Sequence, residues 1–223
     1  MGRLELADQG FCTATLIAPD LILTAAHCLF DAANKAVPAG ALVFRAGWRQ
    51  GRAAATRQVR RYVVHPDYAP NARADMDRVA ADLALLELRQ SIKDPNIAPF
   101  DRHERPSVGA HVHVVSYAED RAEQPALENG CGVLAEDAKI LVLSCDVNFG
   151  ASGSPIFVWH DGAPKITSVV SAMARWENRD VALGTTLGDP LKSLLAELNA
   201  TSGVFKAIRP TGMSVADQLR RRN

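Results

Sequence analysis

The four cysteines place the strongest constraint on how this chain can fold. They form two pairs that are close in sequence, Cys12 with Cys28 and Cys131 with Cys145, and each pair spans two short runs of strand-forming residues. The chain has neither a C-x-x-C motif nor a cysteine and histidine cluster of zinc-ligand spacing, so disulfides are favoured over a metal site. We therefore expect two hairpins, each closed by its own disulfide, no free thiol, and an oxidising compartment.

Composition and charge narrow the class of protein further. The chain has 223 residues, no formal net charge and 48% hydrophobic residues, which suits one large domain or two small barrels. The balanced charge argues against nucleic acid as the main partner. No apolar run approaches the roughly 20 residues that a membrane-spanning helix needs. The first residues are too polar and too few for a signal peptide, whereas the expected disulfides imply an oxidising compartment, so we expect the natural protein to carry a leader ahead of Met1.

Short runs of β-branched and alternating apolar residues predict strands along most of the chain. In the first half we expect strands at 11–17, 21–24, 41–47, 57–64 and 81–88. In the second half we expect strands at 111–115, 130–134, 140–145, 156–159, 166–173 and 181–187. The pattern indicates an all-β fold.

A proline-rich stretch at 91–105 separates the two halves. We place an N-terminal domain at 1–98, a C-terminal domain at 99–199 and a tail at 200–223, which ends in three arginines. Asp189 as N-cap and Pro190 at the first position predict a helix. The apolar face of that helix carries Leu191, Leu194, Leu195 and Leu198.

Three stretches carry residue types that nucleophilic catalysis requires. Gly150-Ala151-Ser152-Gly153-Ser154-Pro155 surrounds one serine with glycines, so the N–H groups of Gly150 and Ser152 can approach a developing oxyanion. His27 follows a strand directly and lies beside Cys28, which gives a rigid mount for a base. Asp82 begins an apolar strand, and a buried carboxylate needs a partner, for which His27 is the natural candidate.

These stretches together resemble the trypsin/chymotrypsin-like serine peptidase family. Thr24-Ala25-Ala26-His27-Cys28, Asp82-Leu83-Ala84-Leu85-Leu86 and the Ser152 stretch occur in the family's order of His, Asp and Ser. Ser154 and the short hairpin closed by Cys131 and Cys145 are more similar to the bacterial branch that includes glutamyl endopeptidases. The resemblance covers roughly residues 2 to 199. It implies two six-stranded antiparallel β-barrels, an active site in the cleft between them, and a C-terminal helix packed outside.

The resemblance also implies the roles of the site residues. Ser152 would be the nucleophile, His27 its base, and Asp82 the group that orients the imidazole, with an acyl-enzyme as intermediate. We expect a secreted or periplasmic endopeptidase, a monomer that acts on peptides or proteins without a cofactor. Asp75 with Asp77, and His111 with His113, lack the further ligands that a calcium or transition-metal site needs, so we expect no metal.

Specificity for Arg or Lys before the cut is the expectation from the pocket residues. Asp146 lies six residues before Ser152, where the resemblance puts the base of the specificity pocket. Ser171 and Met173 align with the substrate-binding edge, and Gly184 is expected to leave room for a long side chain. Glutamyl endopeptidases carry a histidine where this chain has Val170, although some of them also carry an aspartate at the Asp146 position.

The sequence argues against two alternative functions. A catalytically silent binding homologue would usually lose a member of the triad, and none is lost here. An esterase would show the chain order Ser, Asp, His, which this chain does not. Ala151 stands where many animal members carry an aspartate that pairs with the amine freed by zymogen cleavage. We therefore expect that activation switch to be absent in that form.

Overall fold

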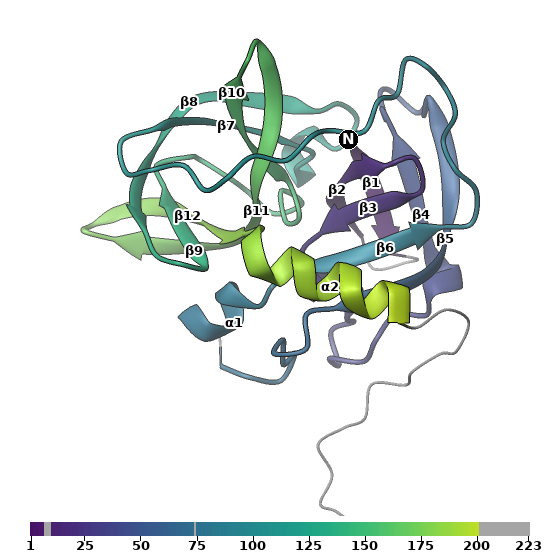
Figure 1. Cartoon of the computed structure of the whole chain (residues 1–223), viewed down its shortest axis with the longest axis horizontal. Helices are drawn as coiled ribbons and strands as arrows, with labels where there is room; N and C mark the ends of the chain where they lie inside the picture. The colour runs from purple at the N-terminus through teal and green to yellow at the C-terminus, as the bar shows by residue number, and fades with distance from the viewer. Residues whose placement is uncertain (7–9, 74, 201–223) are drawn as a thin grey trace, which may run out of the picture.

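The strands fold into two closed, six-stranded antiparallel barrels that lie next to each other (Figure 1). The computed structural model describes residues 1–6, 10–73 and 75–200. The expected all-β, chymotrypsin-like architecture is confirmed. The tail with Arg220, Arg221 and Arg222 lies outside the described residues.

The first barrel encloses a core of large aliphatic side chains. Its sheet order is β1-β2-β3-β6-β5-β4, and pairing of β1 with β4 closes it. The fully buried residues include Leu4, Leu16, Ile22, Phe44 and Leu85. The strands are β1 (Gly2–Leu6), β2 (Phe11–Ala18), β3 (Leu21–Thr24), β4 (Leu42–Ala46), β5 (Ala55–Val64) and β6 (Ala84–Leu88).

Strand β1 was missed by the sequence analysis. Leu4 and Leu6 point into the core, while Arg3 and Glu5, which alternate with them, are only partly buried. A stretch of five residues with two charges gives only a weak strand signal. The alternation is nevertheless that of a half-buried strand, which closes the barrel by pairing with both β2 and β4.

The second barrel has the sheet order β10-β11-β12-β9-β8-β7. Strands β8 and β11 are longer than expected because the residues that flank their apolar runs continue the pairing. In β11 a register shift between Val170 and Ala172 forms a bulge around Ser171, and a bulge re-aims the side chain it carries. The strands are β7 (His111–Ser116), β8 (Ala126–Glu136), β9 (Ile140–Leu143), β10 (Pro155–His160), β11 (Ala163–Trp176) and β12 (Arg179–Thr186).

Both predicted disulfides are confirmed, and no described cysteine is free. Cys12–Cys28 joins β2 to a 3-10 helix at Ala26–Leu29, which carries His27. Cys131–Cys145 joins β8 to the segment that follows β9 and leads toward Ser152. In the chain-entropy model, closing loops of this size stabilises the fold by about 3 kcal/mol each.

Helix α1 (Met76–Ala80) lies in a segment for which the sequence predicts neither a helix nor a strand. The Asp75 carboxylate caps it by accepting the Arg78 N–H at 3.1 Å. Val79 packs in a cluster with residues of the second barrel, and the Thr185 hydroxyl donates to the Val79 carbonyl at 2.6 Å. This helix therefore fastens the loop that precedes Asp82 to the opposite barrel.

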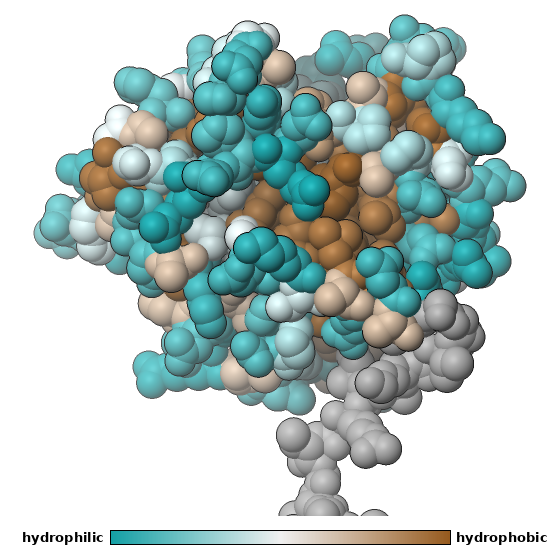
Figure 2. All heavy atoms as spheres, viewed as in Figure 1, coloured by the Kyte–Doolittle hydropathy of each residue, from teal (hydrophilic) through white to brown (hydrophobic). Residues whose placement is uncertain are grey.

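Helix α2 (Gly188–Ala200) packs across the outside of the first barrel (Figure 1). Its buried leucines join the core of that barrel. Hydrophobic residues gather just above it on the face shown in Figure 2. The helix begins at Gly188, so Asp189 lies in its first turn and not at the predicted N-cap position.

Candidate active site

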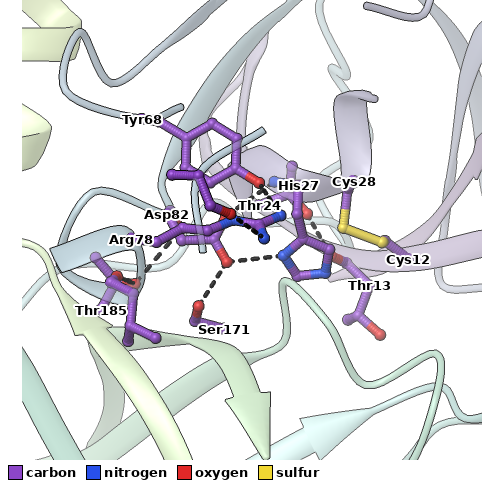
Figure 3. A network of polar contacts seen from close by, with 12 residues as sticks. Cys12, Thr13, Thr24, His27, Cys28, Tyr68, Arg78, Asp82, Ser171 and Thr185 are labelled. Atoms are coloured by element: carbon purple, nitrogen blue, oxygen red, sulfur yellow. Dashed lines mark hydrogen bonds and ion pairs between the residues drawn. A yellow bond between two sulfur atoms is a disulfide. The ribbon is translucent and has the colours of Figure 1, made fainter. Parts of the chain in front are cut away.

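A buried carboxylate holds His27 at two points. Asp82 is 3% exposed, and its Oδ2 lies 2.7 Å from His27 Nδ1 (Figure 3). Its Oδ1 accepts the backbone N–H of His27 at 2.8 Å. Because Nδ1–H faces the carboxylate, the neutral ring carries its lone pair on Nε2, which is the tautomer that can accept a proton there.

Ser171 is a third donor to Asp82. Its hydroxyl donates to Asp82 Oδ2 at 2.5 Å, and the residue is 7% exposed. Ser171 is expected on the substrate-binding edge from the resemblance, but the bulge in β11 turns its side chain toward the carboxylate. The hydrogen bonds from His27 and Ser171 give the buried carboxylate the partners without which its burial would be costly.

Arg78 brings a positive charge close to His27. It lines, with His27, Asp82 and Ser171, a pocket of about 210 Å³. Its Nη2 donates to the Tyr68 hydroxyl at 3.0 Å, and its guanidinium lies 5.5 Å from the centre of that ring. Figure 3 shows Tyr68 and Arg78 beside the His27–Asp82 pair. Nothing in the sequence pointed to this cation, because α1 was not predicted.

Opposing effects set the pKa of His27. Burial lowers the pKa of the imidazole, because it disfavours the cation. The charge and hydrogen bond of Asp82 raise it, and the positive charge of Arg78 lowers it. The net result is a pKa raised above the ordinary value of 6.5. The imidazole therefore binds a proton more readily than an ordinary histidine does.

This balance predicts a pH dependence. A general base must be neutral, so kcat/KM is expected to rise with pH through the pKa of free His27, with a midpoint above 6.5. Arg78→Gln removes a charge that opposes protonation, so the midpoint should move to higher pH. The measurement is kcat/KM against pH for both proteins. Arg73→Gln, an exposed arginine that does not line this pocket, is the control. An unchanged or lower midpoint in Arg78→Gln would contradict the assigned electrostatics.

The Ser152 loop is fastened to both barrels. The N–H of Thr13 in β2 donates to the Ser152 carbonyl at 2.9 Å, and the Gly153 N–H donates to the Val170 carbonyl at 2.9 Å. Gly153 has φ +76°, and a Cβ there would lie 2.0 Å from Thr24 Oγ1, so only glycine fits. The loop thus abuts the end of β3, three residues before His27.

Two backbone donors point out of this loop. The Phe149 carbonyl accepts the Glu119 N–H at 2.9 Å, so the N–H of Gly150 on the same trans peptide points the opposite way. Within the described residues, neither the Gly150 N–H nor the Ser152 N–H donates to another atom. No hydrogen bond joins the Ser152 hydroxyl to His27 in this part of the chain.

The expected pocket residues do not all gather around a substrate site. Asp146 is exposed and makes no ion pair or hydrogen bond with a described residue. A Cβ on Gly184 would lie 2.5 Å from Ser168 Oγ and 2.6 Å from Ile156 Cδ1. Gly184 therefore lies in the packed barrel and does not open room for a substrate, which corrects that expectation. Met173 is exposed, as is Phe149 (65%) beside Gly150, which the sequence analysis did not single out.

Ligand atoms of Cys12, His27 and Cys28 lie within 4.8 Å of one another. The two sulfurs are joined in a disulfide, so they cannot serve as thiolate ligands.

Residues 12–164 match the family described as trypsin-like peptidase domain. No curated protein matches the chain in sequence. One similar solved structure is a thermostable serine protease, AL20, from an extremophilic microorganism, with TM-score 0.69 and 17% identity over 90% of this chain and 96% of that one. Another is a Glu endopeptidase in complex with MPD, with TM-score 0.69 and 19% identity over 89% of each chain. At these identities the structural likeness shows a shared fold.

Proposed function

The chain is a serine endopeptidase of the trypsin-like peptidase family, and we propose that it cuts peptide bonds with a triad of His27, Asp82 and Ser152. One observation carries the proposal. A buried Asp82 accepts two hydrogen bonds from His27 and one from Ser171, which leaves Nε2 of the imidazole available. The loop of the serine is fastened to the strand pair that leads into His27.

The proposed reaction proceeds in two halves. Nε2 of His27 takes the proton of the Ser152 hydroxyl as Oγ attacks the scissile carbonyl, and Asp82 stabilises the imidazolium. The N–H groups of Gly150 and Ser152 donate to the oxyanion. The imidazolium then gives its proton to the leaving amine, and an acyl-enzyme remains. Water, activated by the same imidazole, releases the acid and restores Ser152. A silent binding homologue would have no need of this arrangement.

We further propose a preference for Arg or Lys immediately before the cut. The Asp146 carboxylate is unpaired in the described part of the chain, so its charge is available to a substrate cation. Val170 supplies no imidazole that would receive an acidic side chain. The shared fold with a Glu endopeptidase makes acidic specificity the second candidate.

A set of chromogenic peptides that differ only at the residue before the cut tests both proposals. Arg and Lys peptides should be cleaved fastest, and Asp146→Ser should slow them about tenfold while sparing the Phe peptide. Asp101→Ser, which removes another exposed carboxylate, serves as the control. Faster cleavage after Glu would reject the basic preference alone, whereas no cleavage of any peptide would reject the triad.

The protein is proposed to work as a monomer outside the cytoplasm, secreted or in a periplasm, on peptide or protein substrates. Two disulfides support this location, because such bonds persist in oxidising compartments. No helix in the described ranges has the length and hydrophobicity that a membrane crossing requires.

A further inference from the structure

We propose that Thr13 is a positioning residue that keeps the oxyanion hole formed. The inference rests on the proposed function, since the hole matters only if Ser152 is the nucleophile. Thr13 lies in β2 of the first barrel and is 0% exposed. Its hydroxyl accepts the Tyr117 N–H at 3.0 Å and donates to the Gly150 carbonyl at 3.2 Å, with the Tyr117 carbonyl as a farther acceptor at 3.5 Å.

Thr13 holds both residues that supply the oxyanion donors. Its hydroxyl binds the carbonyl of Gly150, and its backbone N–H binds the carbonyl of Ser152 at 2.9 Å. Thr13 is fixed in turn by the Thr24 hydroxyl, which donates to its carbonyl at 2.8 Å. A residue of the first barrel thus fixes the Gly150–Ala151 and Ser152–Gly153 peptide groups, which adjoin the peptides that carry the Gly150 N–H and the Ser152 N–H.

The Thr13 hydroxyl also binds the chain segment that orients the Gly150 N–H. That segment runs from Tyr117, which donates to Thr13, to Glu119, which donates to the Phe149 carbonyl at 2.9 Å. Gly150 has φ +89°, and a Cβ there would lie 2.9 Å from the Phe11 ring and 3.0 Å from Ala118 Cα. Rotation of the Phe149–Gly150 peptide would break the bond to Glu119 and turn the N–H out of the hole.

The loop has few other polar anchors. Ala151 is 1% exposed and has no polar side-chain group. In the described chain, Thr13 is the only side chain from outside residues 148–155 that hydrogen-bonds to residues 149–153. An acid at the Ala151 position could hold the loop through an ion pair. Here the Thr13 hydroxyl performs that task without an ionised group.

The test compares Thr13→Val, which keeps the shape but loses the hydroxyl, with Thr13→Ser, which restores it. Thr15→Val is the matched control, because Thr15 is a buried threonine of the same strand whose hydroxyl has no described partner. Loss of a whole oxyanion donor costs about 10²- to 10³-fold in kcat, so loosening the hole is expected to cost about tenfold in Thr13→Val. KM should stay within about twofold, because the ground-state carbonyl depends little on the hole.

A second readout separates positioning from general damage to the fold. A peptide aldehyde forms a hemiacetal with the serine whose oxygen occupies the hole, so its Ki should rise about tenfold in Thr13→Val. The Ki of a product peptide without the aldehyde should not change. Thr13→Ser should recover both parameters to within about threefold, and Thr15→Val should resemble wild type. If Thr13→Val does not fold, Thr13→Ala replaces it.

Wild-type kcat and aldehyde affinity in Thr13→Val would overturn the positioning role and leave the triad intact. An equal loss in Thr15→Val would overturn it as well, because the effect would belong to the strand and not to this hydroxyl. An inactive wild type would instead refute the proposed function, and this inference with it.

Discussion

Ser152→Ala is expected to lose peptide hydrolysis, with kcat lower by a factor on the order of 10⁶. The variant lacks the atom that attacks the carbonyl, so no acyl-enzyme can form. Its fold should be retained, because the Ser152 hydroxyl makes no hydrogen bond in the described structure and the loop is held by backbone contacts. Turnover of a chromogenic peptide and the melting temperature are the two measurements.

Ser107→Ala is the control for this substitution, since Ser107 is an exposed serine in the segment between the barrels. It should keep wild-type kcat. Hydrolysis by Ser152→Ala at an unchanged rate would show that another residue is the nucleophile.

Asp82→Asn is expected to lower kcat by about 10⁴-fold at neutral pH. The amide keeps the size of the side chain but carries no charge, so it cannot stabilise the imidazolium. Its NH₂ group can also face Nδ1, which would favour the tautomer with the proton on Nε2 and block proton transfer from Ser152. KM should change little, because the substituted atoms face His27 and Ser171 and not the substrate.

Steady-state kinetics of Asp82→Asn and of the exposed-site control Asp101→Asn provide the comparison. A loss of less than about tenfold in Asp82→Asn would mean that Asp82 does not orient or stabilise the base.

The barrel architecture was predictable because its signals are local or come from family motifs. Cysteine spacing identified both disulfides, and short apolar runs located most strands. The closure of each sheet was implied by the resemblance alone, since strand runs do not specify which edges meet. Strand β1 escaped detection because its two buried leucines alternate with charged residues over only five positions.

Contacts between distant segments explain what the sequence analysis missed. Helix α1 spans only five residues, of which Val79 and Ala80 are buried against the second barrel, so its own sequence resembles a polar loop. The hydrogen bond from Ser171 to Asp82 depends on a β-bulge, and no sequence pattern in β11 predicts that bulge. Gly184 was expected to open the pocket, but Ser168 and Ile156 fill the space beside it. The register of a strand decides on which face of the sheet a glycine lies, and the sequence does not give that register.

The position of Thr13 illustrates the same limit. A threonine next to a cysteine in a strand is unremarkable in sequence, and its role follows only from the meeting of β2 with the Ser152 loop. Strand alternation would place such a polar residue inside a barrel, and that position could nevertheless have indicated a special role. Thr13 and Thr15 both lie in a run of buried residues. Among the described residues, the Thr13 hydroxyl has hydrogen-bond partners and the Thr15 hydroxyl has none.

Labelling with a fluorophosphonate measures directly whether Ser152 is an activated nucleophile. The wild-type chain should take up one phosphonyl group at Ser152, located by peptide mass mapping. Ser152→Ala should take up none, and Asp82→Asn should be labelled far more slowly than wild type. A wild-type chain that stays unlabelled while trypsin in the same reaction is labelled, or an adduct on a residue other than Ser152, would contradict the assignment of this triad.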